Sequence, residues 1–263
     1  MTTGNDDAFY RYYADESLKA ATLERFAAIQ AAVLRAARYF GLQQGPWQVA
    51  DIGCGAATQC ALWAHAGHHV FGVDINEPLI NLGRERAAAA GLKIDLRSGT
   101  ATELPWSSES MDVCLCPELL EHVADWQAVI REAVRVLKPG GVLYLSTTNK
   151  LCPQQEEFDL PGYSWYPAYL KRRYERLSVT TRPELVSHAK YPAVHWFSYF
   201  GLRKHLAAMG MRCLDRFDVA ALEDHGASGR LVLSAIRSVP PLRWAGHVMT
   251  PYTMVFAQRT AAS

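Results

Sequence analysis

Apolar residues follow two spacings between Trp47 and Thr148. Short apolar runs typical of buried strands are separated by stretches with an apolar residue at every third or fourth position, which is typical of helices that face a core. In chain order the segments are Gln48 to Ile52, Ala56 to Ala66, His68 to Asp74, Pro78 to Ala90, Lys93 to Arg97, Met111 to Cys116, Asp125 to Leu137 and Gly141 to Ser146. Alternation of this kind predicts βαβ units and therefore a parallel sheet.

Helical spacing also precedes this region. Apolar residues recur with a helical period from Ser17 to Tyr39, and the pattern stops at Gly41. This suits a long amphipathic helix closed by a glycine C-cap. Ahead of the helix lies a cluster of aromatic residues, namely Phe9, Tyr10, Tyr12 and Tyr13. We predict that residues 1–45 form an N-terminal helical cap.

The alternation stops at Asn149. The stretch from Pro153 to Pro192 is rich in aromatic and proline residues and contains a basic, helix-like piece from Ala168 to Leu177. A segment this long inside a compact domain is usually either a functional lid or an element that the pattern fails to reveal. We predict an insert or lid over residues 149–196. The core, residues 46–148 and 197–263, then resumes with a helix (Phe197 to Met209), a strand (Met211 to Phe217), a helix (Leu231 to Arg237) and a last strand (Tyr252 to Gln258).

Composition narrows the classes of function. The 263 residues carry 27 basic and 26 acidic side chains, a net charge of +1, which gives no overall attraction to nucleic acid or anionic membranes. Six cysteines show no zinc-knuckle spacing, so we predict no metal site. No apolar run reaches the roughly 20 residues of a membrane span, and the first residues lack a signal-peptide core. We therefore expect a cytoplasmic protein.

Two predicted strands end on carboxylates, with a glycine turn after the first. Asp51 is followed by Gly53 and Gly55, and Asp74 closes the second strand. Open α/β sheets bind ligands beyond these strand ends, and a carboxylate about 20 residues after the turn is where a ribose diol is held. Thr58 stands where a dinucleotide fingerprint has its third glycine, which argues against NAD. The alternative role for Asp74 is to cap the following helix.

At these residues the chain resembles the class I S-adenosylmethionine-dependent methyltransferases, and in particular a small-molecule, ubiquinone-biosynthesis-like methyltransferase domain. The matching motifs, in order, are Asp51 to Gly55, Val73 to Ile75, Ser98 to Trp106, and the run from Met111 through Leu120 to Val123 and Arg135 to Gly141. The resemblance implies an α/β, Rossmann-like, doubly wound sheet. It has seven mostly parallel strands with an antiparallel last strand, N-terminal helices and an aromatic-rich insert after the fifth strand.

The resemblance also implies a set of cofactor contacts: Asp51, Gly53, Cys54, Gly55, Asp74, Ile75, Thr100, Ala101, Cys116, Pro117 and Tyr13. Asp51 and the glycine backbone would hold the methionine portion, Asp74 the ribose hydroxyls, and Ile75 one face of the adenine. The chain departs from the family at two positions. Ala57 replaces a frequent third loop glycine, and Thr100 replaces a frequent acidic residue near the adenine amine.

Methyl transfer requires a nucleophile aligned with the S–CH3 bond and the exclusion of water. If the acceptor is an alcohol or phenol, its proton must leave, and a histidine is a suitable general base. We predict this role for His122, which follows the fourth strand. In similar methyltransferases this Glu-His pair recurs with different substrates, so a structural or cofactor-side role for His122 stays open.

The insert supplies the candidate acceptor contacts. Tyr163, Trp165, His195 and Trp196 are predicted to bind the substrate, because large aromatic rings with polar tips suit a lid over a largely apolar acceptor. The alternative is a satellite core beneath a long loop. The nearby Lys171, Arg172, Arg173 and Arg176 form either a solvated helix face or a contact to an anionic acceptor.

Three functions remain open. The first is a methyltransferase that converts S-adenosylmethionine to S-adenosylhomocysteine while methylating a small molecule, on oxygen in preference to nitrogen or carbon. The second, an RNA or protein methyltransferase, lacks the expected basic stripe. The third is a cofactor-binding scaffold without catalysis. Leu242, Trp244, Val248 and Met249, with Arg243 among them, also permit a peripheral membrane contact, although packing is the stronger expectation. The oligomeric state is not predicted.

Overall fold

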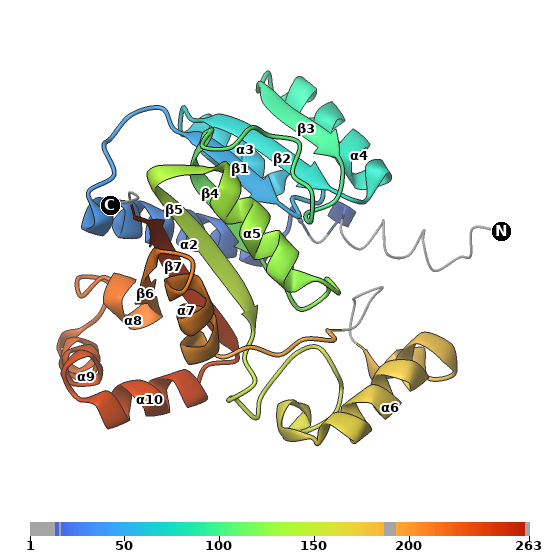
Figure 1. The fold of residues 1–263 in the computed structure, drawn as a ribbon, viewed down its shortest axis with the longest axis vertical. Coiled ribbons are helices and arrows are strands. Elements are labelled where there is room, and N and C mark those ends of the chain that lie inside the picture. The colour runs from blue at the N-terminus through green and yellow to red at the C-terminus, as the bar shows by residue number, and fades with distance from the viewer. Residues whose placement is uncertain (1–13, 16, 187–192, 261–263) are drawn as a thin grey trace.

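A seven-stranded sheet forms the centre of the computed structural model, which describes residues 14–15, 17–186 and 193–260 (Figure 1). The strand order is β3-β2-β1-β4-β5-β7-β6. All neighbours pair in parallel except β7, which is antiparallel to both β5 and β6. The strands are β1 (Gln48–Ile52), β2 (His69–Asp74), β3 (Ile94–Ser98), β4 (Met111–Pro117), β5 (Leu137–Thr148), β6 (Met211–Asp215) and β7 (Tyr252–Arg259). The predicted doubly wound sheet with an antiparallel last strand is confirmed.

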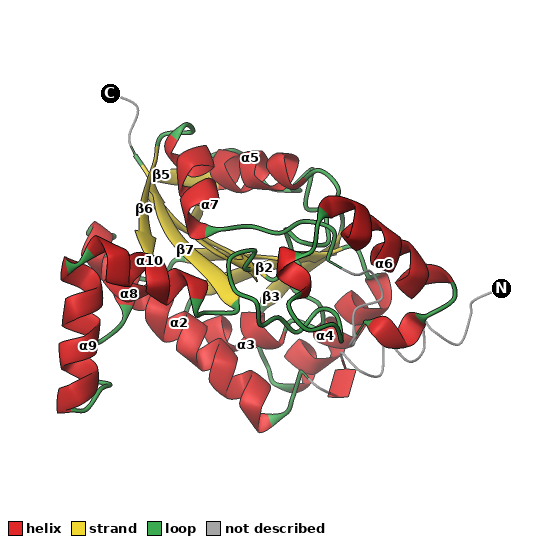
Figure 2. Cartoon of the chain, turned by 90° about the horizontal axis from the view of Figure 1, so that it is seen from below, coloured by secondary structure: helices red, strands yellow, loops and turns green. Residues whose placement is uncertain are grey.

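Helices cover both faces of the sheet, which gives three layers (Figure 2). One apolar core lies with α2 (Ala20–Phe40), α3 (Thr58–His65) and α4 (Glu77–Ala89), and the other with α5 (Trp126–Val136) and α7 (Tyr199–Ala207). The predicted C-cap of α2 is confirmed, since Gly41 has a φ of +76° and its N–H bonds back to the helix. Because β1, β2 and β4 run parallel between the two helical layers, their carboxyl ends lie at one edge of the sheet.

The insert contributes η1 (Tyr163–Trp165), α6 (Ala168–Thr180) and η2 (Pro183–Leu185). Its return joins the sheet edge, because Asn149 at the end of β5 forms a parallel bridge with Phe197. The insert therefore lies beside the carboxyl ends of the strands, as Figure 1 shows for α6. The division into a cap, a core and a lid stays a prediction.

The C-terminal part differs from the sequence-based expectation. The strand predicted from Met211 to Phe217 ends at Asp215, because the Asp215 carboxylate accepts hydrogen bonds from the N–H groups of Phe217 and Asp218 and caps α8 (Arg216–Val219). Further along the chain lie α9 (Ala227–Ser238) and the unpredicted α10 (Pro240–Val248). The spacing of apolar residues does not reveal the Asp215 cap or the helix that begins at Pro240, because both depend on local backbone features.

The apolar residues proposed for a membrane contact lie on and just after α10. Leu242, Trp244 and Met249 are exposed, whereas Arg243 forms ion pairs with Asp215 and Asp218. The membrane contact stays a prediction. None of the helices in the described part of the chain is long and apolar enough to cross a bilayer.

Candidate functional site

The glycine turn after β1 is tied to the end of β2. The Asp74 carboxylate accepts hydrogen bonds from the backbone N–H groups of Gly55 and Asn76, both at 2.8 Å. Asn76, and not Asp74, caps α4, because its side chain accepts from the N–H of Leu79. Asp74 therefore fixes the loop conformation at Gly55, whose φ is +52°, and the helix-cap alternative for Asp74 is wrong.

Asp51 lies at the same edge with its side chain almost completely buried. One carboxylate oxygen accepts from the Cys60 thiol at 3.3 Å, and the other, Oδ1, has no hydrogen-bond partner among the described residues. Burial, reinforced by the nearby charge of Asp74, raises the pKa of Asp51 to about 7. An acidic oxygen held this way is available to a donor group of a ligand.

The loop after β2 and the loop after β3 present the predicted adenine-side residues. The Ile75 side chain is 81% exposed beside Asp74, and Ala101 is partly buried against the core. Thr100 is exposed, but its hydroxyl is bonded to the hydroxyl and N–H of Thr102. The Thr100 hydroxyl is therefore bonded within its own loop. It stands at the position where the family often has an acidic residue.

Four predicted cofactor contacts remain: two have buried side chains, one ends a strand, and one lies outside the described residues. The side chains of Cys54 and Cys116 are buried in the two cores. Burial also raises the pKa of the Cys116 thiol well above its usual value. Pro117 ends β4 at the sheet edge. Tyr13 falls outside the described residues.

Next to this edge, the loop after β4 and the insert bring together Glu121, His122 and Glu157. One carboxylate or imidazole ligand atom from each lies within 4.8 Å of the others, so this trio could hold a cation or exchange protons with a ligand. Glu121 is fully buried; its Oε2 accepts from the Thr147 hydroxyl at 2.8 Å, and its Oε1 has no hydrogen-bond partner in the described chain.

The pKa values of both carboxyl groups in the trio are raised toward neutral pH. Burial raises the pKa of Glu121 to about 8 and that of Glu157 to about 7, and the negative charge of Glu118 adds to both shifts. Glu118 itself forms an ion pair with Arg25 of α2, whose Nη1 lies 2.5 and 2.6 Å from the two carboxylate oxygens. The N-terminal helix is thereby attached to the loop that carries His122.

The return of the insert brings His195 to the same loop. The N–H groups of Val194 and His195 donate to the Glu121 carbonyl, at 2.8 and 3.2 Å, and the His195 ring nitrogen Nε2 lies 3.2 Å from the Ala124 carbonyl. The structure therefore places His195 beside the loop of Glu121 and His122, although the two lie far apart in sequence.

The other predicted acceptor residues form an aromatic cluster within the insert. Tyr163 is fully buried; its ring stacks on Phe158 at 4.0 Å between centroids and meets the edge of Trp196 at 5.7 Å. Trp165 is 61% exposed and donates from its indole N–H to the Leu151 carbonyl. Tyr163 and Trp196 thus build a satellite core, and Trp165 lies on its surface.

Sequence reasoning missed the acidic members of the site. Glu118 and Glu121 lie within the run from Met111 to Val123, in which only His122 is predicted to be catalytic, and Glu157 is in the insert with no motif around it. The Glu-x-x-Glu-His spacing at the end of a buried strand was the available signal. The ion pair of Arg25 with Glu118 spans 93 residues, and no local pattern records it.

Comparisons with known proteins support one family. Residues 50–145 match the family described as methyltransferase domain. A ubiquinone biosynthesis O-methyltransferase of Marinobacter nauticus is 38% identical over 145 residues, 54% of this chain and 60% of that protein. The protein of the same name from Hahella chejuensis is 39% identical over 104 residues, 39% of this chain and 44% of its own. Across the curated relatives compared, the aligned part covers 40–61% of their length.

Solved structures agree at the level of fold. A putative sarcosine dimethylglycine methyltransferase from Galdieria sulphuraria superposes with a TM-score of 0.57 and 18% identity, over 97% of this chain and 98% of its own. At this identity the likeness shows the fold and carries no information about the substrate.

Proposed function

We propose that this chain, whose residues 50–145 form a class I S-adenosylmethionine-dependent methyltransferase domain, transfers the methyl group of S-adenosylmethionine to a hydroxyl group of a small molecule. The observation that carries the proposal is the trio of Glu121, His122 and Glu157 at the end of β4. O-methylation of an alcohol or phenol requires a proton acceptor at the methyl group. The trio lies next to the strand ends that suit the donor.

The residues at the ends of β1 and β2 fit S-adenosylmethionine. The buried Asp51 Oδ1 lacks a partner in the described chain and suits the ammonium of the methionine portion. Asp74 accepts one N–H on each oxygen and retains acceptor capacity for two ribose hydroxyls. A Cβ on Gly55 would meet no atom within 4 Å, so the space over the loop is open, and the exposed Ile75 offers an apolar face to adenine.

The sulfonium supplies an electrophilic methyl carbon when the donor is bound. The protein then has three tasks: to hold the acceptor oxygen in line, to exclude water and to take its proton. A carboxylate with a pKa near 7 accepts a proton efficiently at neutral pH, which makes Glu157 a base candidate alongside His122. Glu121, with a pKa near 8, is mostly neutral at pH 7 and suits orienting the acceptor as a hydrogen-bond donor.

We favour a phenolic acceptor. The partly exposed ring of Trp196 packs against the buried Tyr163 and can offer an apolar face to an aromatic acceptor. Relatives named ubiquinone biosynthesis O-methyltransferase share the motif region at 38–39% identity, which supports an oxygen acceptor on a small molecule. His195, tied to the loop of His122, is then an acceptor-side residue.

A coupled assay of S-adenosylhomocysteine release tests the proposal. The panel contains catechols and hydroxybenzoates, matched anilines, and methyl ethers that have no free hydroxyl. We expect turnover with the hydroxylated compounds only. Exclusive turnover of the anilines would reassign the enzyme to nitrogen, and donor binding without any turnover would favour a scaffold.

Variants of the trio separate chemistry from donor binding. His122→Asn and Glu157→Gln are each expected to lower kcat by about 10²–10⁴ if that residue is the base, because general-base catalysis contributes this much. The Kd for S-adenosylmethionine should stay within twofold. Glu85→Gln, at an exposed position on α4, is the control. Unchanged kcat in both trio variants would contradict the assignment of the proton acceptor.

A further inference from the structure

An apolar groove lies on the face of the sheet that α2 covers. Its volume is about 530 Å³, within the range of small-molecule sites. The walls come from α2, α8, α9 and β7, and most of the lining side chains are apolar. Among them are Phe217, Val232, Ile236, Met254 and Phe256. No carboxylate is among the described residues that line it.

The groove contains one guanidinium that hydrogen-bonds to none of the described residues. The Arg216 guanidinium lines it and forms no hydrogen bond or ion pair with the part of the chain that the structure describes. Burial lowers the pKa of Arg216. The charge of the neighbouring Asp215 acts on Arg216 without a hydrogen bond, because that carboxylate accepts from Arg243, His247 and two backbone N–H groups.

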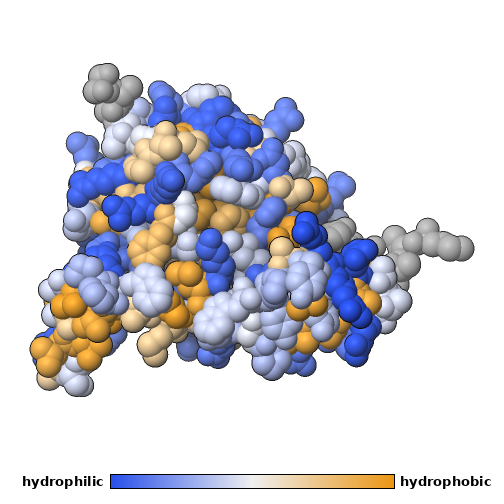
Figure 3. Space-filling model, turned by 60° about the horizontal axis from the view of Figure 1, so that its bottom comes forward, coloured by the Kyte–Doolittle hydropathy of each residue, from blue (hydrophilic) through white to orange (hydrophobic). Residues whose placement is uncertain are grey.

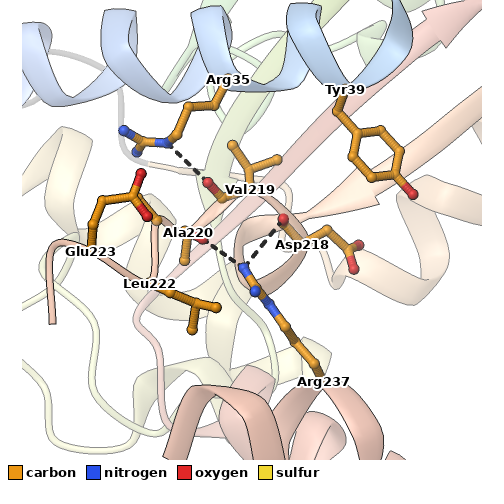
Figure 4. Close-up of a pocket in the computed structure, with 9 residues that line it drawn as sticks. Arg35, Tyr39, Asp218, Val219, Ala220, Leu222, Glu223 and Arg237 are labelled. Carbon is orange, nitrogen blue, oxygen red and sulfur yellow. Dashed lines mark hydrogen bonds between the residues drawn. The ribbon is translucent and has the colours of Figure 1, made fainter. Parts of the chain in front are cut away.

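A neighbouring pocket shows what a purely structural arrangement looks like here. Figure 4 draws this second pocket, which shares Arg35 with the groove and contains the carboxylates of Asp218 and Glu223. There the Arg237 guanidinium donates to the carbonyls of Phe217, Asp218 and Ala220, at 2.7, 3.4 and 2.5 Å. Arg35 donates to the Val219 carbonyl at 3.0 Å.

Both arginines of the second pocket therefore hold the chain between α8 and α9 in place. Arg216 does nothing comparable. Arg216 is partly buried, and its guanidinium bonds to none of the described carboxylates. Such a charge is costly, and an anion in the groove would lower that cost.

We propose that this groove binds a free anionic amphiphile, in which a carboxylate or similar anion pairs with Arg216 and a single apolar chain lies between α9 and β7. The apolar walls supply the driving force for the chain, and Arg216 selects the charge of the head group. Val232, on α9, is 58% exposed and lines the groove, so a bound chain would cover it. Apolar residues also gather at the corner of the surface where α9 lies (Figure 3).

The site is separate from the proposed donor site. The groove is lined by none of the residues assigned to S-adenosylmethionine, so a ligand there can bind whether or not methyl transfer is correctly assigned. This separation allows donor binding to serve as the folding control for every variant.

Titration calorimetry with dodecanoate, below its micelle concentration, tests the proposal on the full chain. We expect one saturable site, weaker binding of octanoate, and no measurable binding of acetate. Arg216→Met should weaken dodecanoate at least about tenfold, the scale of a charged hydrogen bond, and change dodecanol less than twofold. Arg216→Lys should restore most of the dodecanoate affinity.

Two tryptophan variants on α9 locate the apolar chain. Val232→Trp narrows the groove and should abolish dodecanoate binding, whereas Leu231→Trp changes a 73% exposed neighbour outside the lining and should leave binding intact. Both must bind S-adenosylmethionine or, if the donor assignment is wrong, unfold at the wild-type urea midpoint. The proposal is overturned if dodecanoate does not bind, binds equally to Arg216→Met and Val232→Trp, or associates only with phosphatidylglycerol vesicles.

Discussion

Two regions of the molecule are held in different ways. One is the edge at the ends of β1 and β2, called the donor edge, and the other is the aromatic cluster of the insert. At the donor edge, backbone N–H groups bond directly to Asp74, and the exposed Ile75 stands free. In the insert, Tyr163 is enclosed by rings from distant residues. The donor edge is thus preorganised by short backbone contacts, and the insert depends on packing. Damage to one should leave the other working.

Loss of a packed ring should have the largest effect. Tyr163→Ala removes a fully buried ring and should lower the free energy of unfolding by about 3–5 kcal/mol, as large-to-small core changes do. Trp165→Ala, on an exposed ring, should change it by no more than about 0.5 kcal/mol. Urea unfolding measures both. A Tyr163→Ala variant that stays folded but no longer binds S-adenosylmethionine would break the comparison.

The donor edge predicts a smaller, ligand-dependent effect. S-adenosylmethionine at 100 times its Kd should stabilise the wild type by about 2.7 kcal/mol. Asp74→Ala should lose most of this gain, because it removes the proposed ribose contacts and the bond to Gly55. Asp74→Asn keeps one acceptor oxygen and should retain part. Thermal melts with and without the donor give the shift, and an unchanged shift in Asp74→Ala would move the donor elsewhere.

A smaller effect is expected in the pH dependence of stability, which depends on the trio. The pKa of Glu121 is raised from 4.5 to about 8 in the folded state, so Glu121 holds more protons in the folded than in the unfolded chain between these two pH values. The stability of the ligand-free protein should therefore fall as pH rises through 6 to 8. Glu121→Gln should flatten this fall by roughly 1–2 kcal/mol, read from urea midpoints. An equally steep fall in the variant would show that Glu121 does not titrate in this range.

The smallest expected effect is in the glycine loop. Ala57 has a φ of +60°, a left-handed conformation that costs an alanine about 1 kcal/mol. Ala57→Gly should raise the free energy of unfolding by about 0.5 kcal/mol, after the loss of a buried methyl group is offset. Ala56→Gly, next to it and also buried but without a positive φ, should destabilise the chain. If urea unfolding showed Ala56→Gly to be more stable than Ala57→Gly, the loop at Ala57 would not be strained.

The two regions also differ in how far sequence predicts them. Asp51, Gly55 and Asp74 are close in sequence to the strands that position them, so apolar spacing and a motif were enough to predict their edge. The fold of the insert places Glu157 beside Glu121 and His122, and Arg25 contacts Glu118 although 93 residues separate them in sequence. Such contacts depend on tertiary packing. The same reason explains α10, which Asp215 anchors through Arg243 and His247 from 28 and 32 residues away.

The central claim is that the edge of β1 and β2 binds the methyl donor. Titration calorimetry of the wild-type chain with S-adenosylmethionine, and then with S-adenosylhomocysteine, tests this most directly. We expect one site per chain for each, mutual competition, weakened binding in Asp74→Ala and unchanged binding in Trp165→Ala. No saturable heat with either compound, in a chain that unfolds cooperatively, would contradict the claim.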